Sequence, residues 1–250
     1  MTPDFGAITN HLDRYLDGVL MTMELTAISV AAGLALAVPL ALMRVSRKPA
    51  VWMPVYGYVY FFRGTPLLVQ IFLIYYGSGQ FRSWFESAGL WTLFREPYFC
   101  ALLSLTLNTA AYTTEILRGS IQAVPFGEIE AARALGMSRW LLIRRIVLPK
   151  AFRFALPAYT NEVVFLFQAT SLVSIITLMD LFGVARVLIS RTFASFEILI
   201  FVGVIYCAIS YAMLYGFRWI EHRWSGHLRA MPGIAAKGVV AAPVAQPIVR

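Results

Sequence analysis

The chain has 250 residues, of which 59% are hydrophobic and only 14% are charged, and its formal net charge is +8. This composition excludes an ordinary soluble domain and indicates a polytopic helical membrane protein, because the hydrophobic residues fall into long runs. The excess of Lys and Arg does not predict a nucleic-acid partner, since the basic residues lie beside the apolar runs rather than in a separate basic stripe.

Five apolar runs predict five membrane-spanning helices in an all-α transmembrane domain that occupies residues 1–230. The predicted spans lie at about 22–43, 54–76, 98–118, 157–181 and 197–219. The first run holds 19 consecutive uncharged residues, 25–43, enough to cross ~30 Å of hydrocarbon at ~1.5 Å per residue. Residues 77–97 and 182–195 are predicted to be loops. Residues 231–250, rich in Ala, Val and Pro, are predicted to be a disordered tail.

The second apolar run is interrupted in its middle by Arg63-Gly64-Thr65-Pro66. Glycine and proline weaken helices, so Arg63, Gly64 and Pro66 are candidates for a kinked gating segment whose freed carbonyls pair with a neighbouring helix. An arginine at the membrane interface, placed where the crossing proper begins, explains the same residues equally well.

Polar residues recur on one face of the third and of the fourth predicted span. Asn108, Tyr112 and Glu115 follow the spacing i, i+4, i+7. Glu162 and Asp180 are five helical turns apart, so a continuous helix would place them on one face, ~27 Å apart along its axis. A charged group at the bilayer centre costs roughly 2.5–3.5 kcal/mol on insertion scales, so these residues should face protein or a water-filled path.

These polar residues have two interpretations. The functional one makes them a substrate path whose carboxylates attract a cation; its candidates are Asn108, Glu162, Gln168, Thr170, Ser171 and Asp180. The alternative for the carboxylates is that Glu115 and Glu162 pair with Arg118 or Arg153 near the cytoplasmic end, while Asp180 extends to the surface. Asn108 and Gln168 would then form bonds between helices.

The polar segment 119–156 between the third and fourth spans is predicted to be a cytoplasmic loop. A helix is expected over 128–135, ending at Gly136, and a second helix over 140–147, stopped by Pro149. The loops on this side of the membrane hold fifteen Lys and Arg residues, and those on the other side hold five. This bias predicts a periplasmic N-terminus and a cytoplasmic C-terminus.

Neither an ATP site nor a metal site is expected on this chain. None of the three lysines is followed by Ser or Thr, so no P-loop can form, and ATP with its Mg²⁺ would be bound by partner subunits. The three histidines, His11, His222 and His227, do not form a ligand pattern.

One spacing within the loop is distinctive. Glu130-Ala131-Ala132 is followed after three residues by Gly136, and after nine more by Ile146 and then Leu148-Pro149. This pattern resembles the cytoplasmic "EAA" loop of the membrane subunits of bacterial ABC importers, whose first helix sits in a groove on the ATPase subunit. Small alanines would let a partner backbone approach, and Gly136 would permit a sharp bend. A basic loop that only fixes the topology is the alternative.

Three further segments narrow the resemblance: 60–67 (YFFRGTPL), 105–116 (LTLNTAAYTTEI) and 156–163 (LPAYTNEV). Together with the loop they resemble, over about residues 12–229, the polar amino-acid uptake permeases, with the best likeness to the M-type subunits of histidine/lysine-arginine-ornithine permeases and to opine permeases. Many members of the wider family have a lysine just before the position of Thr170, where this chain has Phe167-Gln168-Ala169. That difference weakens any transfer of substrate contacts and favours the basic-substrate branch.

This resemblance implies the fold of a type I ABC importer in the cell inner membrane. It also implies three partners: an ATP-binding subunit dimer, a second permease subunit that is identical or paralogous, and a periplasmic solute-binding protein. The chain itself would catalyse no covalent change. Its implied substrates are basic amino acids of the histidine, lysine, arginine and ornithine type, with opines or glutamine and glutamate as the alternative.

Two other classes of function fit a membrane chain less well. An ion-coupled secondary transporter or channel could use the buried carboxylates, but the five runs show no inverted repeat. An intramembrane enzyme would need a zinc or nucleophile motif, and the sequence has no His-Glu-x-x-His and no Gly-x-Ser-x-Gly.

Overall fold

A computed structural model describes residues 6–224, and within this range every regular element is a helix, which confirms the all-α prediction. The predicted tail, 231–250, lies outside the described residues. The elements in chain order are α1 (Gly6–Thr9), α2 (Leu12–Arg44), α3 (Pro49–Gly64), α4 (Leu67–Gln80), α5 (Arg82–Ser87), α6 (Trp91–Phe94), α7 (Pro97–Gln122), α8 (Phe126–Ala134), α9 (Arg139–Leu142), the π-helical turn η1 (Ile143–Val147), α10 (Leu148–Ala169), the 3₁₀ segment η2 (Thr170–Ile176), α11 (Leu181–Thr192) and α12 (Ser195–Trp224).

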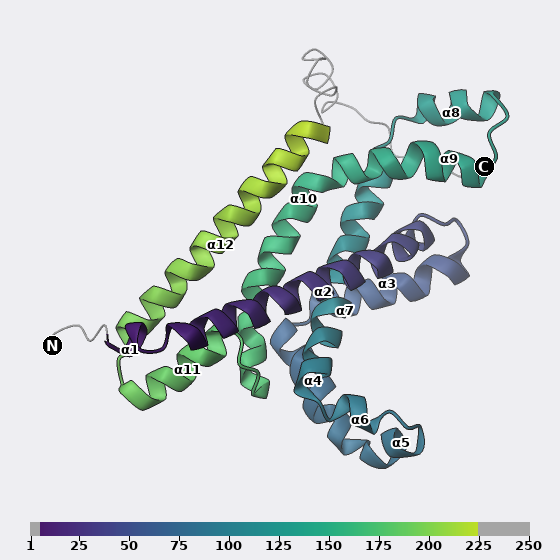
Figure 1. Cartoon of the computed structure of the whole chain (residues 1–250). Coiled ribbons are helices and arrows are strands. Elements are labelled where there is room, and N and C mark those ends of the chain that lie inside the picture. The colour runs from purple at the N-terminus through teal and green to yellow at the C-terminus, as the bar shows by residue number, and fades with distance from the viewer. Residues whose placement is uncertain (1–5, 225–250) are drawn as a thin grey trace.

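Helix α7 is the centre of the bundle and packs against α2, α3, α4 and α10 (Figure 1). Its longest contact is with α2, which turns a stripe of small residues inward at intervals of three or four. The stripe consists of Gly18, Thr22, Thr26, Ser29, Gly33, Ala37 and Ala41, all buried. Close approach of backbones replaces the hydrophobic effect as the source of helix association in lipid, which explains why small residues occupy this face.

Three continuous helical segments are long and apolar enough to cross a bilayer: Leu12–Arg44, Arg139–Ile176 and Ser195–Trp224. Helices α3 and α4 would together make a fourth span, broken by a bend of 105°. The remaining predicted span is α7, which has the length but not the apolar composition. Because other helices surround α7, its buried polar residues, Ser104, Asn108, Thr109, Thr113 and Thr114 among them, face protein rather than lipid.

The helix that contains the fourth predicted span, 157–181, differs from the prediction at both ends. It begins at Arg139 and runs through Pro149 without a stop. Proline lacks the N–H of a helical hydrogen bond, but Pro149 is the second residue of α10, which begins where the π-helical turn η1 ends, and such a turn relaxes the regular ladder where that bond is missing. The helix ends at Ile176, because Thr177 adopts a left-handed conformation with φ of 70°.

Both predicted periplasmic loops contain helices. Residues 77–97 include the end of α4 together with α5 and α6, and residues 182–195 are mostly α11. Helix α11 starts at an N-cap, Asp180, whose carboxylate accepts from the backbone N–H of Gly183 at 3.0 Å and of Phe182 at 3.3 Å. Its apolar face packs on Tyr15 of α2, and α2 itself begins ten residues before the predicted start.

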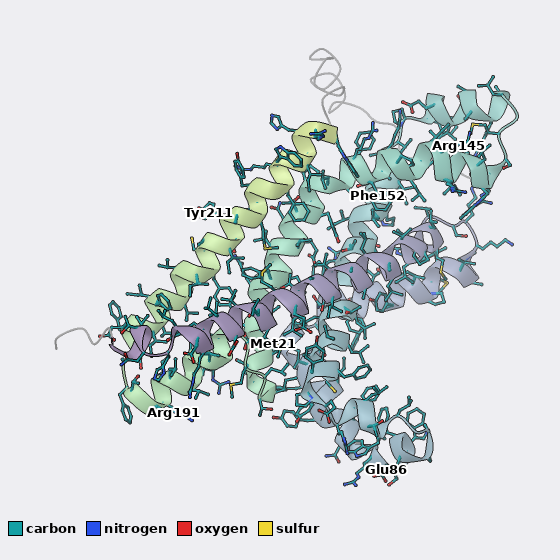
Figure 2. The ribbon with its side chains drawn as sticks, in the orientation of Figure 1. Met21, Glu86, Arg145, Phe152, Arg191 and Tyr211 are labelled. Carbon is teal, nitrogen blue, oxygen red and sulfur yellow. The ribbon has the colours of Figure 1, made fainter. Side chains whose placement is uncertain are left out.

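The two ends of the bundle are different. Helices α8 and α9 extend from one end, whereas α1, α11 and the start of α12 lie together at the other, and α5 with α6 forms a separate extension (Figure 1). Figure 2 shows Arg145 at the α8–α9 end, with Glu86 and Arg191 far from it.

Candidate functional site

The segment between α7 and α10 folds into an elbow. Helix α8 ends at Ala134, and Gly136 follows with φ of +76°, a conformation that glycine adopts without the strain of a side chain. Ser138 then caps α9, because its side chain accepts from the N–H of Leu141 at 3.4 Å. The glycine bend has the local structure that the sequence predicts.

The four residues predicted to contact the ATPase do not lie on one face. Glu130 and Ala131 are exposed, but Ala132 is 3% exposed and packs, with Ile129, into the core of this chain. Ala132 therefore packs α8 against the bundle and is not part of the exposed face of this helix. An ion pair between Lys150 and Glu128 fixes the same helix to the start of α10.

The outer surface of the elbow carries large apolar residues that the sequence analysis missed. Leu135 is 84% exposed, Trp140 66% and Phe126 50%. Exposed apolar residues that lie together mark surfaces that contact another protein or a membrane. No spacing in the sequence marks them, because Phe126 begins α8, Leu135 follows its last residue and Trp140 belongs to α9.

The elbow is joined directly to the transmembrane part. Helices α9, η1 and α10 with η2 form one helical segment of 38 residues, from Arg139 to Ile176. A helix rises about 1.5 Å per residue, so the segment connects the elbow with residues tens of ångströms away. Glu162, Gln168 and Ser171 all lie on it.

The break between α3 and α4 is closed by a side chain of α4 itself, supported by one from α7. The Nε2 atom of Gln70 donates to the carbonyl oxygens of Phe62 and Thr65, at 2.8 and 3.0 Å. Asn108 of α7 donates to Gln70 Oε1 at 2.9 Å. The freed carbonyls of the kink thus pair mainly with Gln70 of the broken run itself, whereas the kink interpretation expected a neighbouring helix; the longer bond from Asn108 of α7 to the Phe62 carbonyl, at 3.4 Å, is of the expected kind. Gln70 was not among the candidate residues.

The other residues of the break have different surroundings. Pro66 is the N-cap of α4, which fits its lack of a donor, and Gly64 is the last residue of α3. The guanidinium of Arg63 lies over the ring of Tyr112 on α7, 5.2 Å from its centroid. Arg63 therefore connects the break to the central helix.

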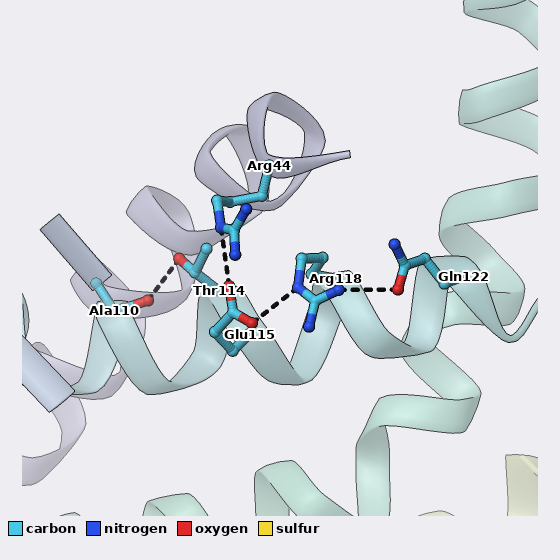
Figure 3. Close-up of polar contacts among 6 residues, drawn as sticks. All are labelled: Arg44, Ala110, Thr114, Glu115, Arg118 and Gln122. Carbon is cyan, nitrogen blue, oxygen red and sulfur yellow. Dashed lines mark hydrogen bonds and ion pairs between the residues drawn. The ribbon is translucent and has the colours of Figure 1, made fainter. Parts of the chain in front are cut away.

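The two glutamates of the third and fourth spans have different partners. Glu115 pairs with Arg118 at 2.8 Å, one of the two predicted pairings, and also with Arg44 of α2 at 3.0 Å (Figure 3). Glu162 does not pair with Arg153: it accepts from the hydroxyl of Thr109 at 3.0 Å and is 9% exposed. The predicted pairing of Glu162 with Arg153 was wrong, because the Glu162 side chain faces α7, where Thr109 donates to it.

The remaining path candidates separate into two groups. Gln168 and Ser171 line a cavity of about 620 Å³ between α10 and α12, where Gln168 donates to Ser210 at 3.4 Å. Thr170 is fully buried and donates to the Phe167 carbonyl at 2.7 Å. Thr170 therefore does not line that cavity.

Asp180 lies in neither of its two predicted positions. It does not share a helix face with Glu162, because the helix ends at Ile176, and it does not extend to the surface, because it is fully buried as the cap of α11. Tyr206 of α12 donates to it at 3.4 Å. No group of His, Cys, Asp and Glu able to hold a metal ion occurs within residues 6–224.

Comparison with known proteins places this geometry in a family. The sequence model of one protein family, the binding-protein-dependent transport system inner membrane component, matches residues 29–226. The chain belongs to this family. It is 49% identical to the nopaline transport system permease protein NocM of Agrobacterium fabrum over 230 residues, which cover 92% of this chain and 95% of NocM.

Other members of the family are also similar over most of their length. The octopine transport system permease protein OccM of Rhizobium meliloti is 50% identical, over 84% of each chain. The histidine/lysine/arginine/ornithine transport system permease protein HisM of Escherichia coli K12 is 42% identical, over 85% of this chain and 89% of HisM.

The crystal structure of an amino acid ABC transporter with histidines superposes on this chain with a TM-score of 0.79 at 32% identity, over 89% of this chain and 100% of that one. The inward-facing MetNI methionine transporter, at 19% identity and a TM-score of 0.73, shares the fold. The chain is thus a multi-pass inner-membrane permease of a binding-protein-dependent transport system.

Proposed function

We propose that this permease translocates polar amino acids of the basic type, or the related opines, with energy from ATP hydrolysed by a separate subunit. The names of the similar proteins support this substrate class, since they specify nopaline, octopine and histidine/lysine/arginine/ornithine transport. The departure at Phe167-Gln168-Ala169 leaves an uncharged wall beside the α10–α12 cavity. A wall without a lysine suits a cationic substrate, because no positive charge at this position repels it.

The proposed assembly contains two permease subunits, identical or paralogous, an ATP-binding subunit dimer that holds ATP and Mg²⁺, and a periplasmic solute-binding protein. The N-terminus would be periplasmic and the C-terminus cytoplasmic. The separation of Arg145 from Glu86 and Arg191 in Figure 2 fits this topology, because it puts the basic elbow at one end and both predicted periplasmic segments away from it.

The continuity of the segment Arg139–Ile176 is the observation that carries the mechanism. Movement of the ATP-binding dimer would be received by the exposed residues of the elbow, Glu130, Ala131 and Leu135. The Gly136 bend and the Lys150–Glu128 ion pair would transmit it to α10. Gln168 and Ser171, on the same helix, would then move relative to α12 and open or close the cavity between them.

A bulky residue at the docking surface tests this mechanism. Ala131→Trp should prevent close approach of the ATP-binding subunit and abolish uptake in proteoliposomes that contain the whole transporter. Ala123→Trp is the matched control, because Ala123 is also exposed at this end of the bundle but lies outside α8. Normal uptake and ATPase stimulation with Ala131→Trp would refute the proposed coupling surface.

The substrate class needs its own experiment. Proteoliposomes with the cognate binding protein should accumulate labelled arginine, histidine or an opine in an ATP-dependent manner, and glutamine less well. Accumulation driven by an ion gradient without ATP would contradict the proposal and favour a secondary transporter.

A further inference from the structure

A second cavity lies at the α8 end of the spans and has no part in the proposed path. Its volume is about 680 Å³, and it shares no lining residue with the cavity at Gln168. The walls come from α2, α7, α10 and the last turn of α12. Most of the lining side chains are apolar, including Leu34, Leu117, Phe152 and Leu156.

The charged residues of this cavity are both arginines. Arg153 and Arg223 are exposed, and neither forms an ion pair with an acidic residue in the part of the chain that the structure describes. Arg223 lies over the ring of Trp219, 5.5 Å from its centroid. An apolar cavity with two unneutralised guanidinium groups is complementary to a molecule that is both anionic and amphipathic.

The depth of the lining residues matches a lipid leaflet. Arg223 is the penultimate residue of α12, and Arg153 lies four residues before the predicted start of the fourth span at 157, so both are near the ends of the spans. Leu34 lies ten residues before the end of α2, about 15 Å further into the span. Tryptophans such as Trp219 and Trp224 are typical of the interface between lipid and water.

One polar atom of the wall lies between these levels. The hydroxyl of Tyr159 is buried and has no hydrogen-bond partner among the described residues. Tyr159 lines the cavity six residues, about 9 Å of helix, beyond Arg153. The ester oxygens of a phospholipid lie below its phosphate, on the side of the acyl chains, and they are acceptors that this hydroxyl lacks.

We propose that an anionic phospholipid from the leaflet on the α8 side occupies this cavity. Its phosphate binds Arg153 and Arg223, its ester region meets Tyr159, and an acyl chain lies along Leu34 and Leu117. The inference uses only the placement of the spans in a bilayer and is independent of the substrate and of ATP coupling. Basic pockets between spans at the cytoplasmic side are suited to such headgroups.

Native mass spectrometry of the assembled transporter tests the site. The transporter is taken from nanodiscs that contain equal amounts of phosphatidylglycerol and phosphatidylcholine, and the retained lipids are counted. Two interfacial arginines give about a 30-fold preference for the anionic lipid, so Arg153→Gln with Arg223→Gln should lower phosphatidylglycerol retention by about that factor. Replacing both arginines by lysine should preserve most of it.

The matched control removes two cations from the same end of the spans without touching the cavity. Lys48 and Arg218 are exposed, and neither lines it. Lys48→Gln with Arg218→Gln should leave retention unchanged. Equal loss in this control, or unchanged retention in the Arg153 and Arg223 variant, would overturn the proposal.

Two other occupants have distinct outcomes. If deleting residues 225–250 were required before any lipid bound, the tail of this chain would fill the cavity instead. If lipid bound only after removal of the second permease subunit, that subunit would be the occupant. Either result overturns the lipid assignment, while a failure of ATP-driven uptake in the Ala131→Trp experiment leaves it intact.

Discussion

The crossing of α2 and α7 allows a quantitative prediction at Gly33. A methyl group added there would lie 2.5 Å from the Cγ2 atom of Thr109, whereas ordinary carbon contacts begin near 3.4 Å, so one of the two must move by almost 1 Å. Thr109 cannot rotate away freely, because its hydroxyl donates to Glu162 at 3.0 Å.

Overpacking of a close-packed interior costs about 1–3 kcal/mol. A chain of this length shifts its melting temperature by roughly 2–4 °C per kcal/mol. Gly33→Ala should therefore lower the melting temperature of the detergent-solubilised complex by about 2–12 °C, although alanine is otherwise the better helix former.

A second substitution makes the test specific. Thr109→Ser removes the clashing methyl group but keeps the hydroxyl that binds Glu162, so Gly33→Ala with Thr109→Ser should recover most of the lost stability. Gly57→Ala is the control, because a methyl group at Gly57 would meet nothing within 4 Å. If the double variant is no more stable than Gly33→Ala alone, the reasoning from this contact is wrong.

Three further predictions concern polar groups, each measured by thermal unfolding of the complex. Gln70→Leu removes the donor to the Thr65 carbonyl and leaves the Phe62 carbonyl with the 3.4 Å bond from Asn108, so it should cost about 1–3 kcal/mol, whereas exposed Gln80→Leu should be neutral; equal effects would argue against the bonded break. Arg44→Gln removes a half-buried pair with Glu115 and should cost about 1.5–3 kcal/mol, while Arg82→Gln, from the exposed pair with Glu86, should cost under about 1 kcal/mol. Asp180→Ala removes the cap of α11 and should cost about 0.5–2 kcal/mol, and Asp180→Asn much less; similar losses in both would contradict capping.

The sequence predicted those features that depend on local pattern. Gly136 was predicted to end a helix and permit a bend, and the chain bends there with a positive φ. The interruption at residues 63–66 was predicted from its Gly and Pro, and the helix is broken there. The helices α2 and α12 could be predicted from the length and hydrophobicity of their sequence runs, because helices with a large apolar surface toward lipid are apolar over most of their length.

The features that the sequence did not predict depend on contacts between distant residues. Gln70 and Asn108 are 38 positions apart, and Thr109 and Glu162 are 53 apart, so no spacing rule links either pair. The passage of the helix through Pro149 required a π-helical turn, which has no simple sequence signal. Asp180 was misplaced because a helix end at Thr177 was mistaken for continuing helix.

The polarity of α7 also has a consequence for biogenesis. A segment that carries so many hydroxyl and amide groups gains little free energy from contact with lipid alone. Its transfer from the translocon into the bilayer as an isolated helix is therefore weakly favoured. The small-residue stripe of α2 is synthesised earlier and can accept α7 as it emerges. Insertion of the third span is therefore expected to depend on the first, and a bulky residue in that stripe would impair membrane integration before it impaired transport.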